Sequence, residues 1–434
     1  MHPPPTGSRP RVLHITQPVD GGVARVVGDM TCRQLSDGLD VVVACPDGPL
    51  ADRLRALGAD VRHWSASRAP GPALGAETAR LARLVGQVRP DLLHAHSAKA
   101  GFAARLAVRG RVPTVFQPHA WSFEAVGGTA AALGLALRWE RYAARWAART
   151  VCVSEAERRR GERAGVPGRW AVLPNGVDTV LFRPAAPGAG AAPGTGAGTG
   201  SPAGAGTPAG GPAGDGAAGP LVVCVGRLCR QKGQDVLLRA WEAVTARLPG
   251  ARLVLVGDGP DRAALAARAP ATVRFAGAVR DPADWYRAAD LVVLPSRWEG
   301  MALAPLEALA CGRPVVVTDT DGAREALPRA LAAHCLVPPE DPAALADALV
   351  ALLQDARLRA ALGRRGRAHV LAAHDVRRTA AALTSLYREL LPAAAPPGPR
   401  RPPPGPAVRP PRPAAPGGTR PAALSPERGE SPQP

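Results

Sequence analysis

Short runs of valine and leucine alternate along this chain with longer segments rich in alanine, leucine and arginine. The short runs are bounded by glycine or proline and have the length of buried strands, whereas the longer segments have the length of helices. This alternation predicts an α/β fold with parallel sheets, because a parallel strand pair needs a long, usually helical crossover. Strands are expected at residues 11–16, 40–44, 91–95, 113–117, 150–153 and 171–173 in the first half, and at residues 221–226, 252–256, 272–275, 291–294, 314–318 and 335–337 in the second.

Low-complexity segments divide the chain. Residues 185–220 consist almost wholly of glycine, alanine and proline, which predicts a flexible linker. Residues 392–434 are rich in proline and, like residues 1–10, are expected to be disordered because they bury too little apolar surface. The prediction is therefore of two doubly wound domains, at residues 11–184 and 221–375, with a C-terminal helix at 376–391 that packs back on the first domain.

Composition indicates how the cores are built and where the protein resides. Apolar residues make up 46% of the chain but aromatic residues only 4%, so cores of valine, leucine and alanine are expected. The seven cysteines are scattered and mostly lie in apolar runs, which is typical of reduced thiols in the cytosol. Neither a signal peptide nor a window of about 18 apolar residues occurs, so a cytoplasmic location without a spanning helix is expected.

A formal net charge of +18 raises the question of an anionic partner. The arginines are spread along the chain without a zinc-finger, RNP-like or helix-turn-helix pattern, which argues against nucleic acid. Residues 138–149 place arginines beside a stripe of Trp139, Tyr142 and Trp146. Such a segment either buries its aromatic residues in the core or docks on an anionic membrane surface, which would make the protein peripheral at the inner face of the membrane.

Only two of the 54 basic residues are lysines, Lys99 and Lys232, and both lie in glycine-flanked segments. In so arginine-rich a chain a retained lysine indicates that a compact ammonium is required, unless the two survive by chance. Lys232 follows Gly226 and Arg227 in the strand–loop–helix segment VGRLCRQKGQ. The forked guanidinium of Arg227 and the point charge of Lys232, at the carboxyl end of a strand, suit a diphosphate. The alternative is that both are solvated cations of a loop.

Two carboxylates, Glu299 and Glu307, flank the start of a predicted helix. Eight positions apart, they would lie about 12 Å apart in a continuous helix. A retaining glycosidase needs about 5 Å between its carboxyl groups, so the spacing favours binding of sugar and ribose hydroxyls over hydrolysis. In the upstream loop VGDGPD, the glycines are expected to let the backbone approach a ligand.

No metal site is expected. Asp319 and Asp321 form an Asp-x-Asp pair, but they follow a late strand, and cationic side chains already serve the phosphates. His94 and His96 share one face of a strand without an evident third ligand, which favours structural or positioning roles. His119 follows a strand, where its imidazole is either a satisfied structural group or donates to a sugar hydroxyl and steadies charge at an anomeric centre.

Together these motifs resemble the retaining glycosyltransferases of family 4. The Glu-x7-Glu pair is preceded by GRLCRQKG and VGDGP and followed by ALACGRPVVVTD. In the first half, HITQPVDGGVARVV, HAHSAKAGFAARLA, QPHAWSFEA and LPNGVD are similar to the family's segments in the same order. The resemblance covers about residues 11–390. It implies a GT-B fold, in which two Rossmann-like domains face each other across a cleft, with the acceptor held by the first domain and the nucleotide sugar by the second.

The resemblance also implies roles for single residues. The implied catalytic set is Arg227 and Lys232 at the donor diphosphate, Glu299 at the transferred sugar, and His119 near the reacting carbon. The implied donor-binding set is Glu307 at the ribose, Val279 and Arg280 at the base, Gly21 and Gly22 at the diphosphate, the backbone of Gly300 and Met301 at the sugar, and Gly226, Ala302 and Leu303. Lys99 is expected to face the cleft toward a donor or acceptor phosphate.

The expected function is retaining transfer of a hexose-type sugar from a nucleotide diphosphate, with a UDP-sugar favoured, to an acceptor hydroxyl. A lipid-linked polysaccharide precursor is the favoured acceptor, with inositol phosphate as acceptor or GDP-mannose as donor as alternatives. Neither a metal nor another cofactor is expected. The alternatives of other classes are a nucleotide-sugar epimerase, a non-enzymatic basic binder of membranes or nucleic acid, and a phosphorylase with lysine-bound pyridoxal phosphate, which neither lysine segment fits.

Overall fold

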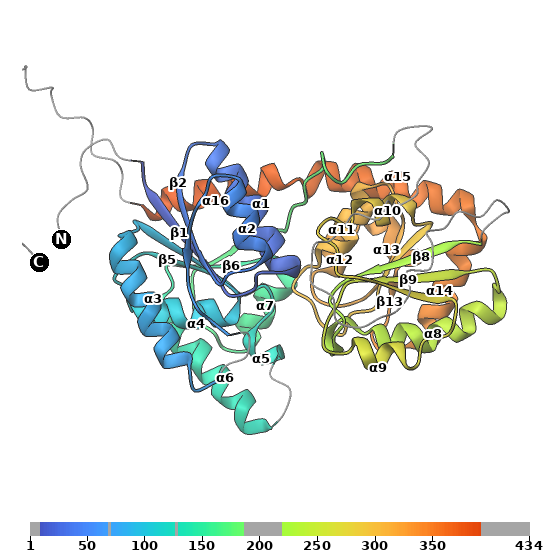
Figure 1. The fold of residues 1–434 in the computed structure, drawn as a ribbon, viewed down its shortest axis with the longest axis horizontal. Helices are drawn as coiled ribbons and strands as arrows, with labels where there is room; N and C mark the ends of the chain where they lie inside the picture. The colour runs from blue at the N-terminus through green and yellow to red at the C-terminus, as the bar shows by residue number, and fades with distance from the viewer. Residues whose placement is uncertain (1–8, 68–70, 126–128, 186–218, 392–434) are drawn as a thin grey trace, which may run out of the picture. The chain divides into compact units, whose positions relative to one another are not determined.

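The computed structural model describes residues 9–67, 71–125, 129–185 and 219–391 (Figure 1). Apart from residues 9, 10, 185, 219 and 220, the segments expected to form a disordered N-terminus, a flexible linker and a disordered tail lie outside the described residues. The described chain forms two lobes, each built around its own sheet. We call residues 9–185 the first lobe and residues 219–375 the second lobe.

Both sheets are parallel throughout and carry helices on both faces (Figure 1). The first has the order β3-β2-β1-β4-β5-β6-β7 and the second the order β10-β9-β8-β11-β12-β13. The strands are β1 (Arg11–Thr16), β2 (Asp40–Cys45), β3 (Asp60–His63), β4 (Leu92–His96), β5 (Thr114–Gln117), β6 (Arg149–Cys152), β7 (Trp170–Val172), β8 (Leu221–Val225), β9 (Arg252–Val256), β10 (Val273–Gly277), β11 (Leu291–Leu294), β12 (Val315–Thr318) and β13 (Leu336–Val337). The predicted α/β class is confirmed.

Helices connect the strands in both lobes. The first lobe contains α1 (Gly21–Ser36), α2 (Pro49–Ala56), α3 (Leu74–Val88), α4 (Ser97–Val108), α5 (Ser122–Ala125), α6 (Ala130–Ala143), η1 (Ala144–Trp146) and α7 (Glu155–Arg163). After β8 come η2 (Arg230–Lys232), α8 (Gln234–Arg247), α9 (Arg262–Ala266), α10 (Ala283–Ala288), α11 (Leu303–Ala310), α12 (Ala323–Ala326), α13 (Arg329–Cys335), α14 (Pro342–Gln354), α15 (Ala356–Ala373) and α16 (Val376–Leu390). The last helix, α16, packs against α1 of the first lobe.

The two faces of β1 pack against different helices. Leu13 and Ile15 join a core cluster with residues of α3 and α4. Val12 lies on the opposite face in a cluster with Met30 of α1, as expected from the period of two along a strand. His14 shares that face and is fully buried, so a polar ring lies beneath α1 and α16 in an otherwise apolar layer.

The central strand pairs are β1 with β4 and β8 with β11. In the first sheet, β2 and β3 lie on one side of β1, whereas β4 and then β5 to β7 lie on the other side. The strand order therefore reverses between β1 and β4. Ligands of open parallel sheets bind outside the carboxyl ends of the strands at such switch points. Both sheets therefore have a position suited to a ligand.

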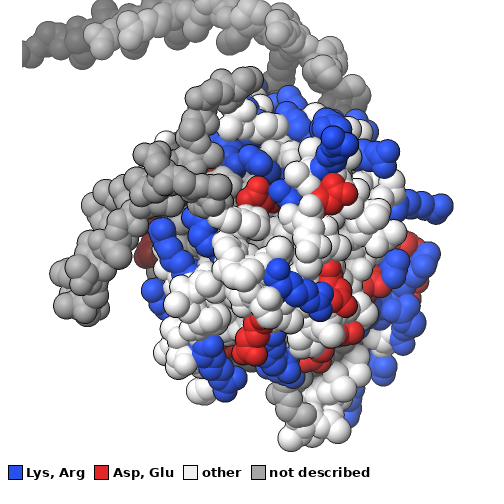
Figure 2. Space-filling model, turned by 90° about the vertical axis from the view of Figure 1, so that its right-hand side faces the viewer, with Lys and Arg blue, Asp and Glu red and all other residues white. Residues whose placement is uncertain are grey.

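The described helices and the surface charge can be compared with the expectations for membrane and nucleic-acid partners. Among the described helices, none combines the length and the apolar character needed to cross a lipid bilayer. On the face drawn in Figure 2, basic side chains are interspersed with acidic ones and with uncharged surface. The described part of that face therefore shows mixed charge and not a continuous basic patch of the kind that binds nucleic acid.

Candidate active site

Two residues of the predicted catalytic set are in contact in the second lobe. The ammonium of Lys232 forms an ion pair with the carboxylate of Glu299. Ser296, which follows β11, donates its hydroxyl to Oε1 of Glu299 at 2.8 Å. Both charged side chains reach solvent, with 20% of the Lys232 side chain and 11% of the Glu299 side chain exposed. This part of the site combines a cation and an anion beside a partly open surface.

Backbone packing explains the loop that carries Lys232. Gly233 follows η2 with a φ of 65°, a conformation that glycine adopts without strain. A Cβ at this position would lie 2.1 Å from the carbonyl oxygen of Pro295. Glycine thus allows the loop after β8 to contact the loop after β11, which brings Lys232 to Glu299.

A pocket adjoins this ion pair. Its lining includes Glu299 and Ala302 from the loop after β11, together with Ser296, Thr318 and Asp321. Pro305, in the first turn of α11, also lines it. The pocket therefore lies at the carboxyl ends of β11 and β12, where the fold places ligands.

The first lobe contacts the backbone next to Glu299. Ser154 donates its hydroxyl to the carbonyl oxygen of Gly300 at 3.0 Å. Asn175 donates its side-chain amide to the carbonyl oxygen of Met301 at 2.8 Å. A Cβ on Gly300 would lie 3.2 Å from the backbone nitrogen of Ala120. The segment predicted to hold the transferred sugar thus lies against the loop that follows His119.

The loop at His119 has an unusual backbone. His119 and Ala120 have φ values of 55° and 101°, which non-glycine residues rarely adopt. Glu157 of α7 holds the loop by accepting from the backbone nitrogens of Ala120 and Val153, both at 2.7 Å. Burial raises the pKa of Glu157 to about 7. The sequence analysis did not identify Glu157, although its position three residues after an N-capping serine, Ser154, marks it as a first-turn residue.

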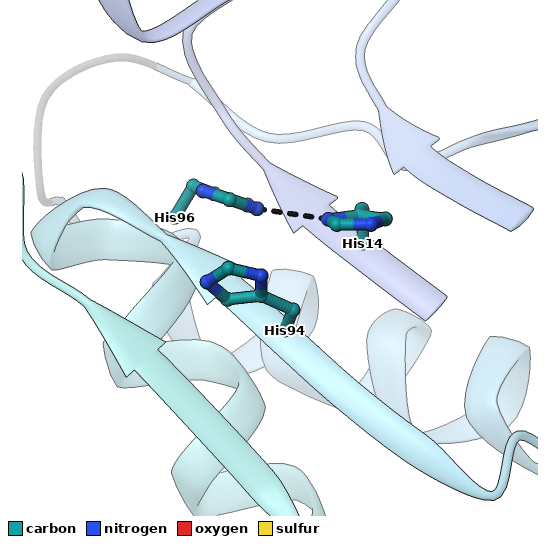
Figure 3. A group of neighbouring side chains, drawn as sticks. All are labelled: His14, His94 and His96. Carbon is teal, nitrogen blue, oxygen red and sulfur yellow. Dashed lines mark hydrogen bonds between the residues drawn. The ribbon is translucent and has the colours of Figure 1, made fainter. Parts of the chain in front are cut away.

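His119 is half-buried and contacts a group of buried histidines. Its Nε2 lies 3.1 Å from Nδ1 of His96. Figure 3 shows His96 with His94 from the same strand and His14 from the neighbouring strand β1. Nδ1 of His14 lies 2.9 Å from Nε2 of His96. The third ring that the sequence analysis did not find is thus His14, which register brings opposite His94.

These three histidines are the one group among the described residues whose ligand atoms lie close enough to hold a metal ion. Two of those nitrogens are already joined by the 2.9 Å hydrogen bond. The rings of His94 and His96 are tilted by 37° and partly overlap, with centroids 3.9 Å apart, whereas metal ligands point lone pairs in the ring plane at a common centre. The arrangement therefore favours hydrogen bonding over metal binding.

Glu307 lies in a separate interlobe contact. Its carboxylate is ion-paired with Arg25 of α1 at 3.2 Å and accepts from the hydroxyl of Tyr286 at 2.7 Å. Burial raises the pKa of Glu307, and Arg25 opposes that rise. Arg25 also donates to the carbonyl oxygen of Arg280 at 3.2 Å. The implied ribose and base residues Glu307 and Arg280 are thus brought together by a first-lobe arginine that the sequence analysis missed.

Lys99 has protein partners. Its ammonium is ion-paired with Glu77 of α3 at 2.8 Å and donates to the carbonyl oxygen of Ser67 at 2.6 Å. Burial acts to raise the pKa of Glu77, but hydrogen bonds from Lys99 and Ser67 outweigh it and lower that pKa. Lys99 therefore ties α4 to α3, and its role at a phosphate stays a prediction.

The other implied donor-binding residues lie at the strand ends. A Cβ on Gly21 or Gly22, at the start of α1, would meet nothing within 4 Å, so the backbone there is open to approach. Arg227 is half-buried, and its guanidinium makes no ion pair with any described residue. Gly226 precedes it directly after β8, and Val279 is 36% exposed. Leu303 begins α11.

The glycines of VGDGPD have a structural role that the sequence analysis did not foresee. A Cβ on Gly257 would lie 2.0 Å from the carbonyl oxygen of Gly226. A Cβ on Gly259 would lie 2.2 Å from the carbonyl oxygen of Leu228. Both glycines let this loop pack against the loop after β8, so the expected approach of a ligand is not needed to explain them.

The Asp-x-Asp segment is engaged by arginines. Asp319 is ion-paired with Arg324. Asp321 is ion-paired with Arg160 of α7, across the lobes, at 2.9 Å for one of its oxygens. The role of Asp319, which the sequence left open, therefore includes a local ion pair, and Asp321 contributes to the contact between the lobes.

Comparison with solved structures defines the fold. Anabaena Alr3699/HepE in complex with UDP-glucose matches with a TM-score of 0.70 at 22% identity, over 87% of this chain and 99% of that chain. Sucrose-phosphate synthase from Thermosynechococcus elongatus matches with a TM-score of 0.69 at 21% identity, over 88% and 99%. The fold is that of the GT-B glycosyltransferases, as predicted.

Sequence comparison adds the family. The family described as Glycosyl transferases group 1 matches residues 219–355, and Glycosyltransferase Family 4 matches residues 20–181. Together the two matches cover more than half of the chain. It therefore belongs to the group 1 glycosyltransferases of family 4, as the sequence motifs predict.

Two curated relatives illustrate the range of the family. The GDP-mannose-dependent monoacylated alpha-(1-6)-phosphatidylinositol monomannoside mannosyltransferase of Corynebacterium glutamicum is 34% identical over 210 residues, 46% of this chain and 50% of the relative. The D-inositol 3-phosphate glycosyltransferase of Corynebacterium jeikeium is 41% identical over 187 residues, 39% of this chain and 43% of the relative. The chain thus matches about half the length of these relatives or less.

Proposed function

We propose that this protein transfers a sugar from a nucleotide diphosphate sugar to an acceptor hydroxyl, with retention at the anomeric carbon. The observation that carries the proposal is the contact of the Lys232–Glu299 pair, through Gly300, with the His119 loop of the other lobe. The ion pair thus lies next to a backbone contact with the loop that carries His119, at the carboxyl ends of two parallel sheets. This arrangement suits a ligand with a diphosphate and many hydroxyls.

In the proposed reaction, negative charge develops on the departing diphosphate. Lys232 and the guanidinium of Arg227 stabilise that charge, and stabilisation of developing charge lowers the barrier. Donor binding would shift the Lys232 ammonium from Glu299 toward the phosphate and release the carboxylate to accept from sugar hydroxyls. The acceptor attacks on the face that the diphosphate leaves, and a diphosphate oxygen takes the acceptor proton.

The donor is proposed to be UDP- or GDP-linked. The sequence motifs favour a UDP-sugar, and the GDP-mannose dependence named for the Corynebacterium glutamicum relative supports the second candidate. We propose that no metal is required, because cationic side chains serve the phosphates. The two carboxylates of the Asp-x-Asp segment are meanwhile held by arginines.

The test is release of nucleotide. The protein is incubated with UDP-glucose, UDP-galactose, UDP-N-acetylglucosamine and GDP-mannose, with and without inositol phosphate, and in the presence or absence of EDTA. We expect release from one donor, faster with an acceptor and unchanged by EDTA. Release abolished by EDTA would contradict the metal-free reaction. Absence of release from every donor, with salt-sensitive binding to vesicles, would favour a non-enzymatic binder, and conversion of donor to its epimer would favour an epimerase.

A lipid-linked acceptor would place the protein at an anionic membrane surface. On α6, Leu133 and Leu135 are 41% and 71% exposed, and Tyr142 is 53% exposed beside exposed Arg138 and Arg141. Apolar and basic side chains on one helix suit the membrane interface. Trp139, in contrast, stacks on Phe102 with centroids 4.1 Å apart, so part of the aromatic stripe is packed.

Sedimentation with vesicles tests this surface. We expect Leu135→Glu to weaken binding to phosphatidylglycerol vesicles severalfold, because it places a negative charge on the docking face. Leu371→Glu on α15, where Leu371 is 42% exposed, is the matched control and should bind as the wild type. Equal loss in both variants, or equal binding to phosphatidylcholine vesicles, would contradict the proposed surface.

A further inference from the structure

A chain of hydrogen bonds leads from the interior of the first lobe to His119. Oε1 of Gln34 lies 2.8 Å from Nε2 of His14. Nδ1 of His14 lies 2.9 Å from Nε2 of His96, and Nδ1 of His96 lies 3.1 Å from Nε2 of His119. The first three side chains are fully buried, and only His119 reaches solvent. The chain comes from α1, β1, the end of β4 and the loop after β5.

A chain of neutral imidazoles has a direction, because each ring has one N–H donor and one acceptor nitrogen. The amide oxygen of Gln34 only accepts, so His14 donates from Nε2 and keeps a lone pair on Nδ1. His96 donates from Nε2 to that lone pair. His119 then donates from its own Nε2 to Nδ1 of His96. The last ring is left with an unprotonated Nδ1.

The buried rings are neutral at pH 7. Burial lowers the pKa of His14 to about 4, although the hydrogen bond to Gln34 opposes the shift. Burial also lowers the pKa of His96 well below its ordinary value. An imidazolium would place two N–H groups in a chain that has one acceptor per ring, so the neutral form also satisfies the geometry.

The orientation of Gln34 sets the direction of the whole chain. Oε1 of Gln34 faces Nε2 of His14, whereas Nε2 of Gln34 has no hydrogen-bond partner among the described residues. The amide oxygen is therefore the atom that anchors the chain.

The end of the chain opens toward the candidate active site. Within the described residues, Nδ1 of His119 makes no hydrogen bond. The next residue, Ala120, lies against Gly300, which is adjacent to Glu299 in the second lobe. The residue that carries this acceptor nitrogen is therefore adjacent to the one that contacts the segment predicted to hold the sugar.

We propose that His14 and His96, anchored by Gln34, are positioning residues that hold His119 as the Nε2–H tautomer, so that its Nδ1 accepts a hydrogen bond from a substrate hydroxyl. The inference rests on the proposed function for the identity of the ligand. It replaces the sequence-based expectation that His119 donates to a sugar hydroxyl. A site built in this way selects a ligand that presents an O–H donor at this point and rejects one with an acceptor alone.

Nitrogen NMR of the full chain, labelled with 15N-histidine, reads the tautomer directly. The signals of His119 are identified among the nine histidines by their loss in His119→Gln. We expect a protonated Nε2 and an unprotonated Nδ1 at pH 7. A proton on Nδ1 would overturn the proposal. Because this spectrum needs no substrate, its outcome is separate from that of the nucleotide-release assay, which tests the proposed function.

Gln34→Met removes the anchoring acceptor without changing the length of the side chain much. We expect both tautomers at His119 and a loss of about tenfold in kcat/KM, the worth of one hydrogen bond. Thr31→Val on the same helix is the control, because Thr31 is fully buried and its hydroxyl has no partner among the described residues. It should keep the wild-type tautomer and kcat/KM. A single unchanged tautomer in Gln34→Met would contradict the proposal.

Gln34→Glu provides a second variant, which guards against misfolding of Gln34→Met. It keeps an acceptor beside Nε2 of His14, so we expect it to restore the Nε2–H tautomer at His119. Loss of that tautomer in a folded Gln34→Glu protein would show that the direction of the chain is not set at Gln34 and would overturn the assignment.

Discussion

Among single residues, Glu157 holds the backbone of the loop beside the candidate site. It holds the backbone at Ala120, where the chain adopts a conformation that costs about 1–3 kcal/mol in a non-glycine residue. Such strain persists only where surrounding contacts maintain it. The carboxylate is fully buried, and its pKa is raised to about 7 by that burial.

This pKa predicts a pH dependence of stability. A carboxyl group whose pKa is 4.5 when unfolded and about 7 when folded favours the folded state most below pH 4.5. That contribution is lost as the pH rises toward 7, so the wild type should lose stability relative to Glu157→Gln over this range. Urea unfolding of both proteins at pH 5 and pH 8 measures it. A difference that stays constant, or grows with pH in favour of the wild type, would contradict the assigned pKa.

The candidate-site residues predicted from the sequence lie in continuous motifs. Lys232, Glu299 and Gly300 are recognisable because glycine-flanked loops after strands are local patterns. Arg25 and His14 were missed because their partners lie far away in the chain, at Glu307 and His96. Strand register brings His14 opposite His94. The signal that would have identified His14 is the presence of polar rings inside two apolar strands that become neighbours in a doubly wound sheet.

Among the elements, α4 and β5 show how close packing depends on one glycine. A Cβ on Gly101 of α4 would lie 2.1 Å from Cε2 of Phe116 in β5. We therefore expect Gly101→Ala to lower the free energy of unfolding by about 1–3 kcal/mol, the usual cost of overpacking. A Cβ on Gly86 of α3 would meet nothing within 4 Å, so Gly86→Ala should raise it by about 0.5–1 kcal/mol. Urea unfolding measures the free energy of unfolding of both variants. If the two substitutions changed it in the same direction, the packing described here would be contradicted.

Every strand expected from the sequence is present, with ends that differ by two residues at most. The structure also contains one strand that was not expected from the sequence, β3 (Asp60–His63). It pairs with β2 at the edge of the sheet and has no buried residue. A strand without a buried face lacks the apolar period from which strands are predicted, so tertiary pairing alone defines it.

At the scale of the whole molecule, the lobes meet through charged and polar contacts. Glu325 accepts from the backbone nitrogens of Glu155 and Ala156 at 2.7 and 2.8 Å, at the start of α7. The pair of Arg25 with Glu307 is the most buried ion pair between the lobes among the described residues, with 18% and 4% of the side chains exposed. Removal of either side chain of this pair would leave the other as a buried charge without an opposite charge beside it, which is destabilising.

Arg25→Met should therefore destabilise the protein by roughly 3 kcal/mol, as is usual when one partner of a buried pair is removed. Arg33→Met on the same helix is the control, because Arg33 forms an exposed pair with Asp37 that is worth less than about 1 kcal/mol. Urea unfolding of the two variants is the measurement. Equal effects would mean that the lobes do not make this contact in solution.

In the proposed reaction, the ammonium of Lys232 acts on the leaving diphosphate at the meeting point of the two lobes. The most direct measurement is the rate of nucleotide release by Lys232→Arg, with the reverse exchange Arg239→Lys on the exposed side of α8 as control. A guanidinium cannot replace a compact charge in this loop, so we predict a loss of roughly 100-fold in kcat for Lys232→Arg. Arg239→Lys should turn over like the wild type. Full activity of a folded Lys232→Arg protein would contradict the account.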